Sequence, residues 1–336
     1  MLALGAPLIT GCRAQSNVAG EVSNIPEDLN SDDILTINDE IAEFSMSIEA
    51  NPQDAIAYNK RGISKKKLGD YRGAINDFSK ALEIDSQDAK SYYNRGIVKA
   101  KLEDYQGAIA DYNKAIEINP NDADFYSNRG STKIDTEDYL AAIEDFDAAL
   151  EINPNDDIFY YNRSVAKIKL GDYRGAIDDL SKAMEINPND IDSWKDRGFA
   201  KIKLKDYRGA IADFNKALEL NPQDASAHYN LGNAKNGLGD HQEAIVDFTK
   251  AIEINPQDAG SYINRGTARF RIKDYLGTIL DCSKAIEINP RNSTAYLNRG
   301  IAKGSSGDHK SACTDIEKAA ELGDEDAAEL FRKNCS

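Results

Sequence analysis

Arginine and aspartate recur along this chain at a spacing that could pair them. An aspartate stands every 34 residues in eight successive segments, and an arginine stands sixteen residues before it in seven of them. The arginines are Arg61, Arg95, Arg129, Arg163, Arg197, Arg265 and Arg299, and the aspartates are Asp77, Asp111, Asp145, Asp179, Asp213, Asp247, Asp281 and Asp315. Two antiparallel helices with a turn midway would bring each arginine against its aspartate, which predicts a ladder of structural ion pairs. A row of arginines that anchors ligand carboxylates is the weaker alternative, because each arginine already has a local partner. The sixth segment has Leu231 instead of arginine, so we expect Lys235 to pair with Asp247.

Other reactive residue types are few and scattered. The three histidines, His228, His241 and His309, stand where other segments carry aromatic packing residues. Four cysteines are too few for a disulfide scaffold and lack the spacing of zinc ligands. No serine lies in a nucleophile elbow, and no glycine loop suits phosphate. We therefore expect no enzyme activity, no cofactor and no metal site.

The net charge restricts the class of partner. The chain has 336 residues and a formal charge of -16. An acidic surface repels phosphate backbones, so we expect no nucleic-acid binding and a preference for basic or apolar partners. No run of about 18 apolar residues occurs, and we expect no membrane-spanning helix.

The spacing of the charged residues arises from an internal repeat of 34 residues. Counted from Ala55, eight repeats follow one another without an insertion, and positions within a repeat are numbered 1 to 34 below. The repeats are 55–88, 89–122, 123–156, 157–190, 191–224, 225–258, 259–292 and 293–326. Each is predicted to be two helices: apolar residues recur at helical spacing, an aspartate at position 16 caps the second helix, and "NP" ends it in most repeats. We expect a partial repeat at 34–54 with a helix near 34–49. After the last repeat we expect a C-terminal capping segment at 327–336, whose helix extends from about 325 to 334.

The residue types within the repeat resemble those of a known family. Position 4 is mostly Tyr or Trp, position 8 mostly Gly, positions 20 and 27 mostly Ala, and position 32 mostly Pro. This pattern resembles the tetratricopeptide repeat over residues 55–326. The resemblance implies an all-α solenoid, a right-handed superhelix of eight helix-turn-helix repeats whose first helices line a concave groove. It implies binding of a protein or peptide partner and no chemistry by itself.

Groove residues are expected at positions 2, 5, 9 and 12, which share one face of the first helix. The candidates are Tyr93, Ile97, Tyr161, Val165, Ile168, Phe199, Ile202, Tyr229, Ile263 and Phe270. Such residues either pack neighbouring first helices together or form an apolar channel for a partner segment, and both can hold for one residue. We expect a continuous apolar stripe in repeats four and five, from Tyr161 to Ile202.

The family's clamp for a partner's C-terminal carboxylate is incomplete in this chain. That clamp uses lysine at position 5 and asparagine at position 9 of one repeat. Position 5 is lysine only at Lys195, and its companion at position 9 is Phe199. We expect acidic C-terminal tails to bind poorly, and the asparagines at position 6 to bond a bound backbone or neighbouring helices.

Cysteines near the two ends of the chain lie in patterns that suggest specific roles. The stretch "MLALGAPLITGC" resembles a bacterial lipoprotein signal, although no Lys or Arg precedes its apolar run. The resemblance implies a signal at 1–12, lipidation of Cys12 and a polar tether at 13–33. At the other end Cys313 and Cys335 lie symmetrically about residue 324 in a turn, and we expect them to form a disulfide if the protein is exported.

Together these features favour a noncatalytic interaction scaffold, monomeric by itself, tethered by lipid to the exported face of a cell envelope membrane. One alternative is a cytoplasmic adaptor or co-chaperone in which Cys12 is a chance residue of a polar tail. Another is the binding subunit of an enzyme complex.

Changing Cys12 tests the tether. Expressed from its natural gene, the protein should partition into detergent and carry acyl chains on Cys12, whereas Cys12→Ala should lose the lipid and leave the membrane fraction. Two acyl chains suffice for stable attachment, and one does not. Mass spectrometry of the mature N-terminus provides the measurement. A soluble wild-type protein that keeps residues 1–11 would contradict the tether and favour the cytoplasmic adaptor.

Overall fold

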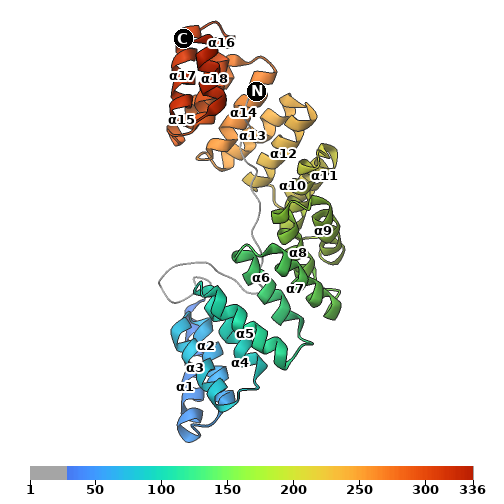
Figure 1. The fold of residues 1–336 in the computed structure, drawn as a ribbon, viewed down its shortest axis with the longest axis vertical. Helices are drawn as coiled ribbons and strands as arrows, with labels where there is room; N and C mark the ends of the chain where they lie inside the picture. The colour runs from blue at the N-terminus through green and yellow to red at the C-terminus, as the bar shows by residue number, and fades with distance from the viewer. Residues whose placement is uncertain (1–28, 336) are drawn as a thin grey trace. The chain divides into compact units, whose positions relative to one another are not determined.

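The computed structural model describes residues 29–335, and the regular structure in that range is entirely α-helical (Figure 1). By contact the chain divides into two compact halves after Asn187. The N-terminal half contains α1 (Ser31–Ala50), α2 (Ala55–Lys67), α3 (Tyr71–Ile84), α4 (Ala89–Lys101), α5 (Tyr105–Ile118), α6 (Ala123–Asp135), α7 (Tyr139–Ile152), α8 (Asp157–Leu170) and α9 (Tyr173–Ile186). The C-terminal half contains α10 (Ile191–Lys203), α11 (Tyr207–Leu220), α12 (Ala225–Leu238), α13 (His241–Ile254), α14 (Ala259–Arg271), α15 (Tyr275–Ile288), α16 (Ser293–Ser305), α17 (His309–Glu321) and α18 (Glu325–Asn334).

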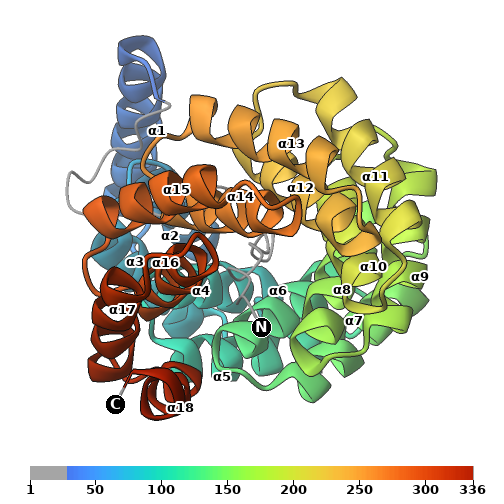
Figure 2. The same cartoon turned by 90° about the horizontal axis from the view of Figure 1, so that it is seen from above.

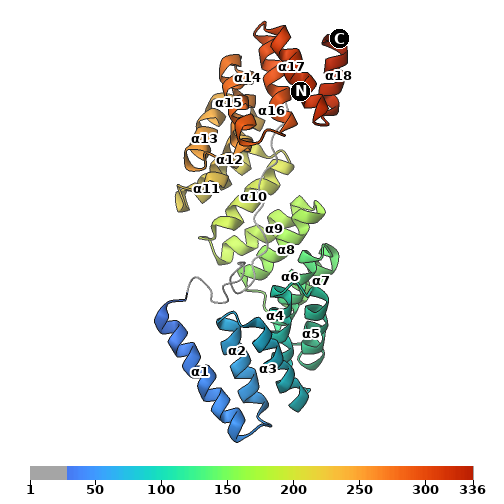
Figure 3. The same cartoon turned by 90° about the vertical axis from the view of Figure 1, so that its left-hand side faces the viewer.

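Helices pack in the same order within each half. The two helices of a repeat form a hairpin, and each second helix also packs against the first helix of the next repeat, as α13 does against α14 (Figures 2 and 3). First helices of neighbouring repeats also touch, as α4 does with α6 and α12 with α14. This stacking of hairpins confirms the predicted all-α solenoid.

Local sequence fixes where the helices begin and end. The aspartate at position 16 is the N-cap of each second helix, and in the first repeat Asp70 accepts a hydrogen bond of 2.9 Å from the Gly73 amide. Asp240 is the one cap of these eight without a side-chain bond. Position 15 has a positive φ in all eight repeats, at four glycines and at Glu103, Glu137, Lys205 and Lys273. The turn therefore forces a left-handed conformation on side chains that rarely adopt it.

Close approach of the two helices depends on a glycine at position 8. A Cβ built on Gly96 would lie 2.7 Å from the ring of Tyr112, the fully buried residue at position 24. In the seventh repeat position 24 is Cys282, and a Cβ on Gly266 would lie at an ordinary 3.5 Å from its Sγ. The aromatic ring at position 24 therefore occupies the space that a side chain at position 8 would need, in keeping with the close packing of protein interiors.

The ends of the described chain are helical. Asn30 caps α1 with a capping box, so the helix begins at Ser31 rather than near residue 34. At the other end α18 begins at Glu325, as expected for the capping helix and two residues before the capping segment that we placed at 327–336. Among residues 29–335 no helix combines the length and apolarity needed to cross a membrane.

Two glycine substitutions form a matched test of this packing. Gly96→Ala should lower the free energy of unfolding by about 1–3 kcal/mol, since its new methyl group would overlap the buried Tyr112 ring. Gly266→Ala should leave stability unchanged or raise it by up to about 1 kcal/mol, because alanine favours the helix and meets no close atom. Urea denaturation followed by circular dichroism measures both. Equal losses in the two variants would show that the glycine–ring contact does not control the helix spacing.

Candidate binding surfaces

The charged residues of each repeat form a compact group between its two helices. In the second repeat, Arg95 Nε and Nη2 donate to the two oxygens of Asp111 at 2.8 and 2.7 Å. The guanidinium lies over the ring of Tyr92 at position 4, 5.5 Å from its centroid, and Nη1 donates to Ser79 of the preceding repeat at 3.0 Å. The hydrogen bond with Asp111 is the largest cause that raises the pKa of Arg95. The predicted ion-pair ladder is confirmed in all seven repeats that carry the arginine.

A second cation, at position 11, completes each group and was missed by our sequence analysis. Lys99 Nζ lies 2.7 Å from Asp111 Oδ2. The corresponding residues are Lys65, Lys133, Lys167, Lys201, Lys235, Arg269 and Lys303, all paired with the aspartate of their own repeat. Position 11 is basic in every repeat, and it lies one helical turn after position 7, so the signal was present in the sequence. In the sixth repeat Lys235 pairs with Asp247 at 2.7 Å, as predicted.

The predicted groove residues differ in how far solvent reaches them. Six are buried, with exposed fractions of 1% to 3%: Tyr161, Val165, Ile168, Phe199, Tyr229 and Ile263. Four are half-buried: Tyr93, Ile97, Ile202 and Phe270. Of the expected stripe, Tyr161, Val165 and Ile168 lie on α8 in the N-terminal half, and Phe199 and Ile202 lie on α10 in the C-terminal half. Replacing Tyr161 and Phe199 would cost stability as well as any partner contact. A test of binding by substitution should therefore use groove residues that are only half-buried.

Polar side chains on the first helices connect neighbouring repeats. Asn128 Nδ2 donates to the Tyr93 hydroxyl at 2.9 Å, and Asn264 Nδ2 donates to the Tyr229 hydroxyl at 3.0 Å. In each case an asparagine at position 6 bonds a tyrosine at position 5 of the preceding repeat. Of our two expectations for position 6, these contacts support the bond to a neighbouring helix.

The one lysine that fits the carboxylate clamp has partners of its own. Lys195 Nζ lies 2.9 Å from Asp224 and 3.1 Å from Asp192. Hydrogen bonds to both carboxylates raise its pKa and outweigh the effect of its burial, which is the largest single influence. A ligand carboxylate would have to displace them, which agrees with poor binding of acidic tails.

A pocket opens on the groove face at the C-terminal end of the array. Its volume is about 230 Å³, and it is lined by Leu297 and Ile301 of α16 and by α18. Leu297 and Ile301 occupy positions 5 and 9, where groove residues were expected. From α18 come the apolar Leu330 and the charged Asp326, Glu329 and Lys333. The terminal helix therefore forms one wall of a small pocket with a mixed apolar and charged lining.

A disulfide holds that wall in place. Cys313 of α17 and Cys335 after α18 are bonded, with their Cα atoms 5.5 Å apart. Cys282, at position 24, is free and buried, and burial raises the pKa of its thiol to about 12. Cys12 lies outside the described residues. Within the described chain no three His, Cys, Asp or Glu side chains converge to hold a metal ion.

Comparison with known proteins places these features in a family. Models of the tetratricopeptide repeat match residues 89–122, 225–258, 111–144 and 159–190, and a model described as TPR repeat matches 65–103 and 198–237. No curated protein matches the chain in sequence.

Solved structures give the same result. YrrB, described as a TPR protein with an unusual peptide-binding site, is 27% identical over 55% of this chain and 95% of its own, with a TM-score of 0.50. A tetratricopeptide repeat protein from Parabacteroides merdae is 21% identical over 74% of this chain and 100% of its own, with a TM-score of 0.59. PilF of Pseudomonas aeruginosa is 18% identical over 63% and 97%, with a TM-score of 0.54, and like the previous structure it supports the fold alone.

Reduction of the disulfide should loosen the terminal wall and leave the rest of the array folded. The bond spans 22 residues, and a loop of this size contributes about 3 kcal/mol to the local stability. Hydrogen exchange of α18 should accelerate after reduction and in Cys335→Ser, with little change in α12. The buried, protonated Cys282 should resist iodoacetamide in both native forms, and it provides the internal control for foldedness. Unchanged exchange of α18 would show that packing alone holds the wall.

Proposed function

This chain belongs to the tetratricopeptide repeat family, and on that basis we propose that it is a noncatalytic scaffold that binds segments of protein partners along its row of first helices. The pocket between Leu297, Ile301 and α18 is the observation that carries the proposal. Residues at groove positions 5 and 9 line this pocket together with Leu330 and three charged side chains of α18. A short apolar segment of a partner fits such a space, in the way that amphipathic helices enter grooves.

YrrB provides supporting evidence. It is described as having a peptide-binding site, and its 27% identity extends over 95% of its own chain. Since function in a shared fold resides in specific sites, the likeness supports peptide binding as a class and leaves the sequence of the peptide open. The net charge of -16 favours partners with basic residues beside the apolar ones.

The location of the scaffold is a further part of the proposal. The motif Ile9, Thr10, Gly11 and Cys12 supports lipid attachment and a position on the exported face of a membrane. These residues lie outside the described chain, so this part rests on the sequence alone. A cytoplasmic adaptor or the binding subunit of an enzyme complex would use the same groove, and the Cys12→Ala experiment separates export from the cytoplasm.

Position 9 offers a matched test of the groove. Ile97 on α4 and Ile301 on α16 are half-buried on the groove face, while Leu140 on α7 and Leu276 on α15 are exposed on second helices at 68% and 69%. Peptides selected from a random phage-displayed library against the full chain should bind Ile97→Ser/Ile301→Ser at least about tenfold more weakly, a loss of roughly 1.4 kcal/mol. The control Leu140→Ser/Leu276→Ser removes a comparable pair of side chains from the other face and should bind normally.

Melting temperature must be measured for both variants. Should the control lose the selected peptides while the groove variant keeps them, the second helices would be the binding face and the proposal would be wrong.

A further inference from the structure

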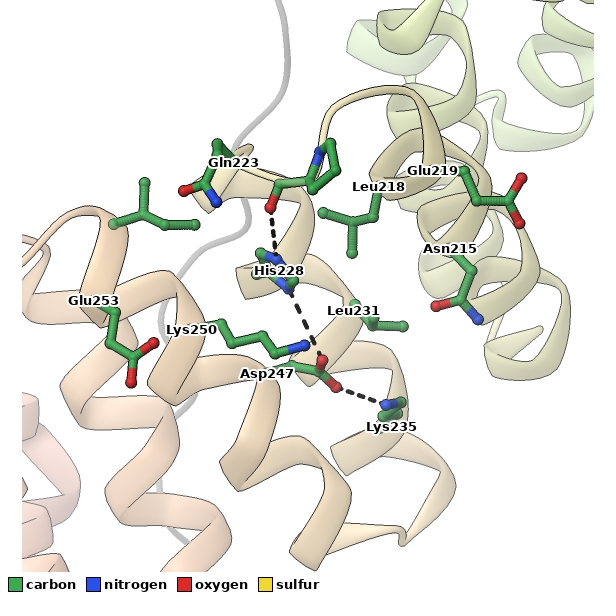
Figure 4. Close-up of a pocket in the computed structure, with 12 residues that line it drawn as sticks. Asn215, Leu218, Glu219, Gln223, His228, Leu231, Lys235, Asp247, Lys250 and Glu253 are labelled. Carbon is green, nitrogen blue, oxygen red and sulfur yellow. Dashed lines mark hydrogen bonds and ion pairs between the residues drawn. The ribbon is translucent and has the colours of Figure 1, made fainter.

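The sixth repeat contains a cavity at the position where the other seven repeats carry an arginine. Its volume is about 860 Å³, and it lies between α11, α12 and α13 (Figure 4). Its lining includes Asn215, His228, Leu231, Lys235, Asp247 and Lys250.

The third repeat shows what occupies the same place elsewhere in this chain. Arg129 Nε donates to Asp145 Oδ2 at 3.0 Å, and Nη2 donates to Asp145 Oδ1 at 2.5 Å. Its Nη1 donates to Asn113 Oδ1 of the preceding repeat at 2.6 Å, and its guanidinium lies 5.6 Å from the ring centroid of Tyr126. One guanidinium thus satisfies a carboxylate, an amide oxygen and an aromatic face from three different helices.

In the sixth repeat the acceptors remain and the guanidinium is gone. Asn215 corresponds to Asn113 and Asp247 to Asp145, while Leu231 replaces the arginine and His228 replaces the tyrosine. Asp247 is as buried as its counterparts, with 4% exposed against 3% for Asp145. It keeps the second cation, Lys235, but has lost the two-pronged bond.

His228 leaves a buried ring nitrogen without a hydrogen-bond partner beside this carboxylate. Its Nε2 lies 3.2 Å from the Pro222 carbonyl oxygen, which can only accept, so Nε2 donates this bond. Nδ1, which accepts a hydrogen bond when the ring is neutral, has no hydrogen-bond partner within the described chain. Asp247 Oδ1 lies 3.9 Å away, too far for a bond, and only 7% of His228 is exposed. A donor placed between this nitrogen and the carboxylate could bond both and satisfy the buried ring.

The lysine at position 26 of the sixth repeat, Lys250, is arranged differently from its counterparts. In six other repeats the lysine at position 26 pairs with the glutamate at position 29, at 2.5 to 2.8 Å. In the sixth repeat Lys250 and Glu253 form no such pair, although both belong to the described chain. Lys250 instead extends toward Asp247, with Glu253 pointing elsewhere (Figure 4). Lys250 therefore adds a cation of the protein's own to the lining of the cavity.

The cavity and the groove lie on different faces of α12. Positions 4, 7 and 11 carry His228, Leu231 and Lys235, and at 100° per residue they point away from groove positions 5 and 9. A ligand in the cavity and a peptide in the groove could bind together, so this site extends beyond the proposed function.

We propose that the cavity of the sixth repeat binds the side chain of an arginine presented by a partner polypeptide. The guanidinium donates to Asp247 and Asn215 and bonds His228 Nδ1, taking the place that Arg129 occupies in the third repeat. Lys250 returns to Glu253 when the arginine enters. A chain with a net charge of -16 also attracts such a basic partner.

Histidine ring signals in NMR spectra of the full chain provide a direct test. The protein has three histidines, so His241 and His309 serve as internal controls for His228. Titration with N-acetyl-arginine methylamide should shift the His228 signals saturably and leave the other two unchanged. The citrulline analogue, which has the same shape without the charge, should bind at least about tenfold more weakly. Equal saturation by both compounds, or no saturable shift at His228, would overturn the proposal.

Variants that fill or open the cavity test the assignment independently. His228→Tyr/Leu231→Arg supplies the missing guanidinium from within, and it should melt at a higher temperature. Because it removes the His228 probe, binding to it is measured by calorimetry, and should be at least about tenfold weaker than to wild type. Asp247→Asn should weaken binding similarly, whereas Lys250→Met should strengthen it by removing the competing cation. Undiminished binding to a folded double variant would place the arginine elsewhere.

Discussion

The buried carboxylate at position 23 is the constraint on which each repeat depends. These eight aspartates are between 0% and 4% exposed, and a charge so far from water is stable only when paired and hydrogen-bonded. In seven repeats the pairing groups, at positions 7 and 11, both come from the first helix of the same repeat. The two helices must therefore align in one register, and the glycine at position 8 lets them approach closely enough for the bonds to form. Removing the arginine would take away the two-pronged bond and leave the aspartate paired with the cation at position 11 alone, which would lower the free energy of unfolding.

The sixth repeat shows how that constraint can be relaxed without losing the fold. Lys235 still neutralises Asp247, and Leu231 joins the apolar cluster of Ala210 and Phe214 that the neighbouring helices share. Stability is thus kept by one cation and by apolar packing, and polar acceptors are left over. Surplus acceptors in a buried place are costly unless something binds them. The proposed arginine site rests on this departure from the repeat.

Packing and recognition use different positions of the same helices. Positions 7, 8, 20, 23, 24 and 27 hold similar residues from repeat to repeat, because each must fit the same neighbours. Positions 2, 5, 9 and 12 vary, and in the eighth repeat Leu297 and Ile301 open into a pocket whose other wall is α18. A scaffold can in this way keep one architecture and change its partner through a few side chains.

The sequence by itself determined the helices, their caps and the ion-pair ladder, since these depend on contacts within one repeat whose residues lie at fixed short spacings. Asp111 and Arg95 could be matched because only sixteen residues and one turn separate them. Burial of Tyr161 and Phe199, by contrast, depends on everything that surrounds α8 and α10, and the sequence could not distinguish an open stripe from packed side chains. The cavity of the sixth repeat was likewise decided by tertiary structure. The sequence showed Leu231 and His228 as separate substitutions. Only the folded chain brings them beside Asn215 and Asp247, because those acceptors come from three helices and two repeats.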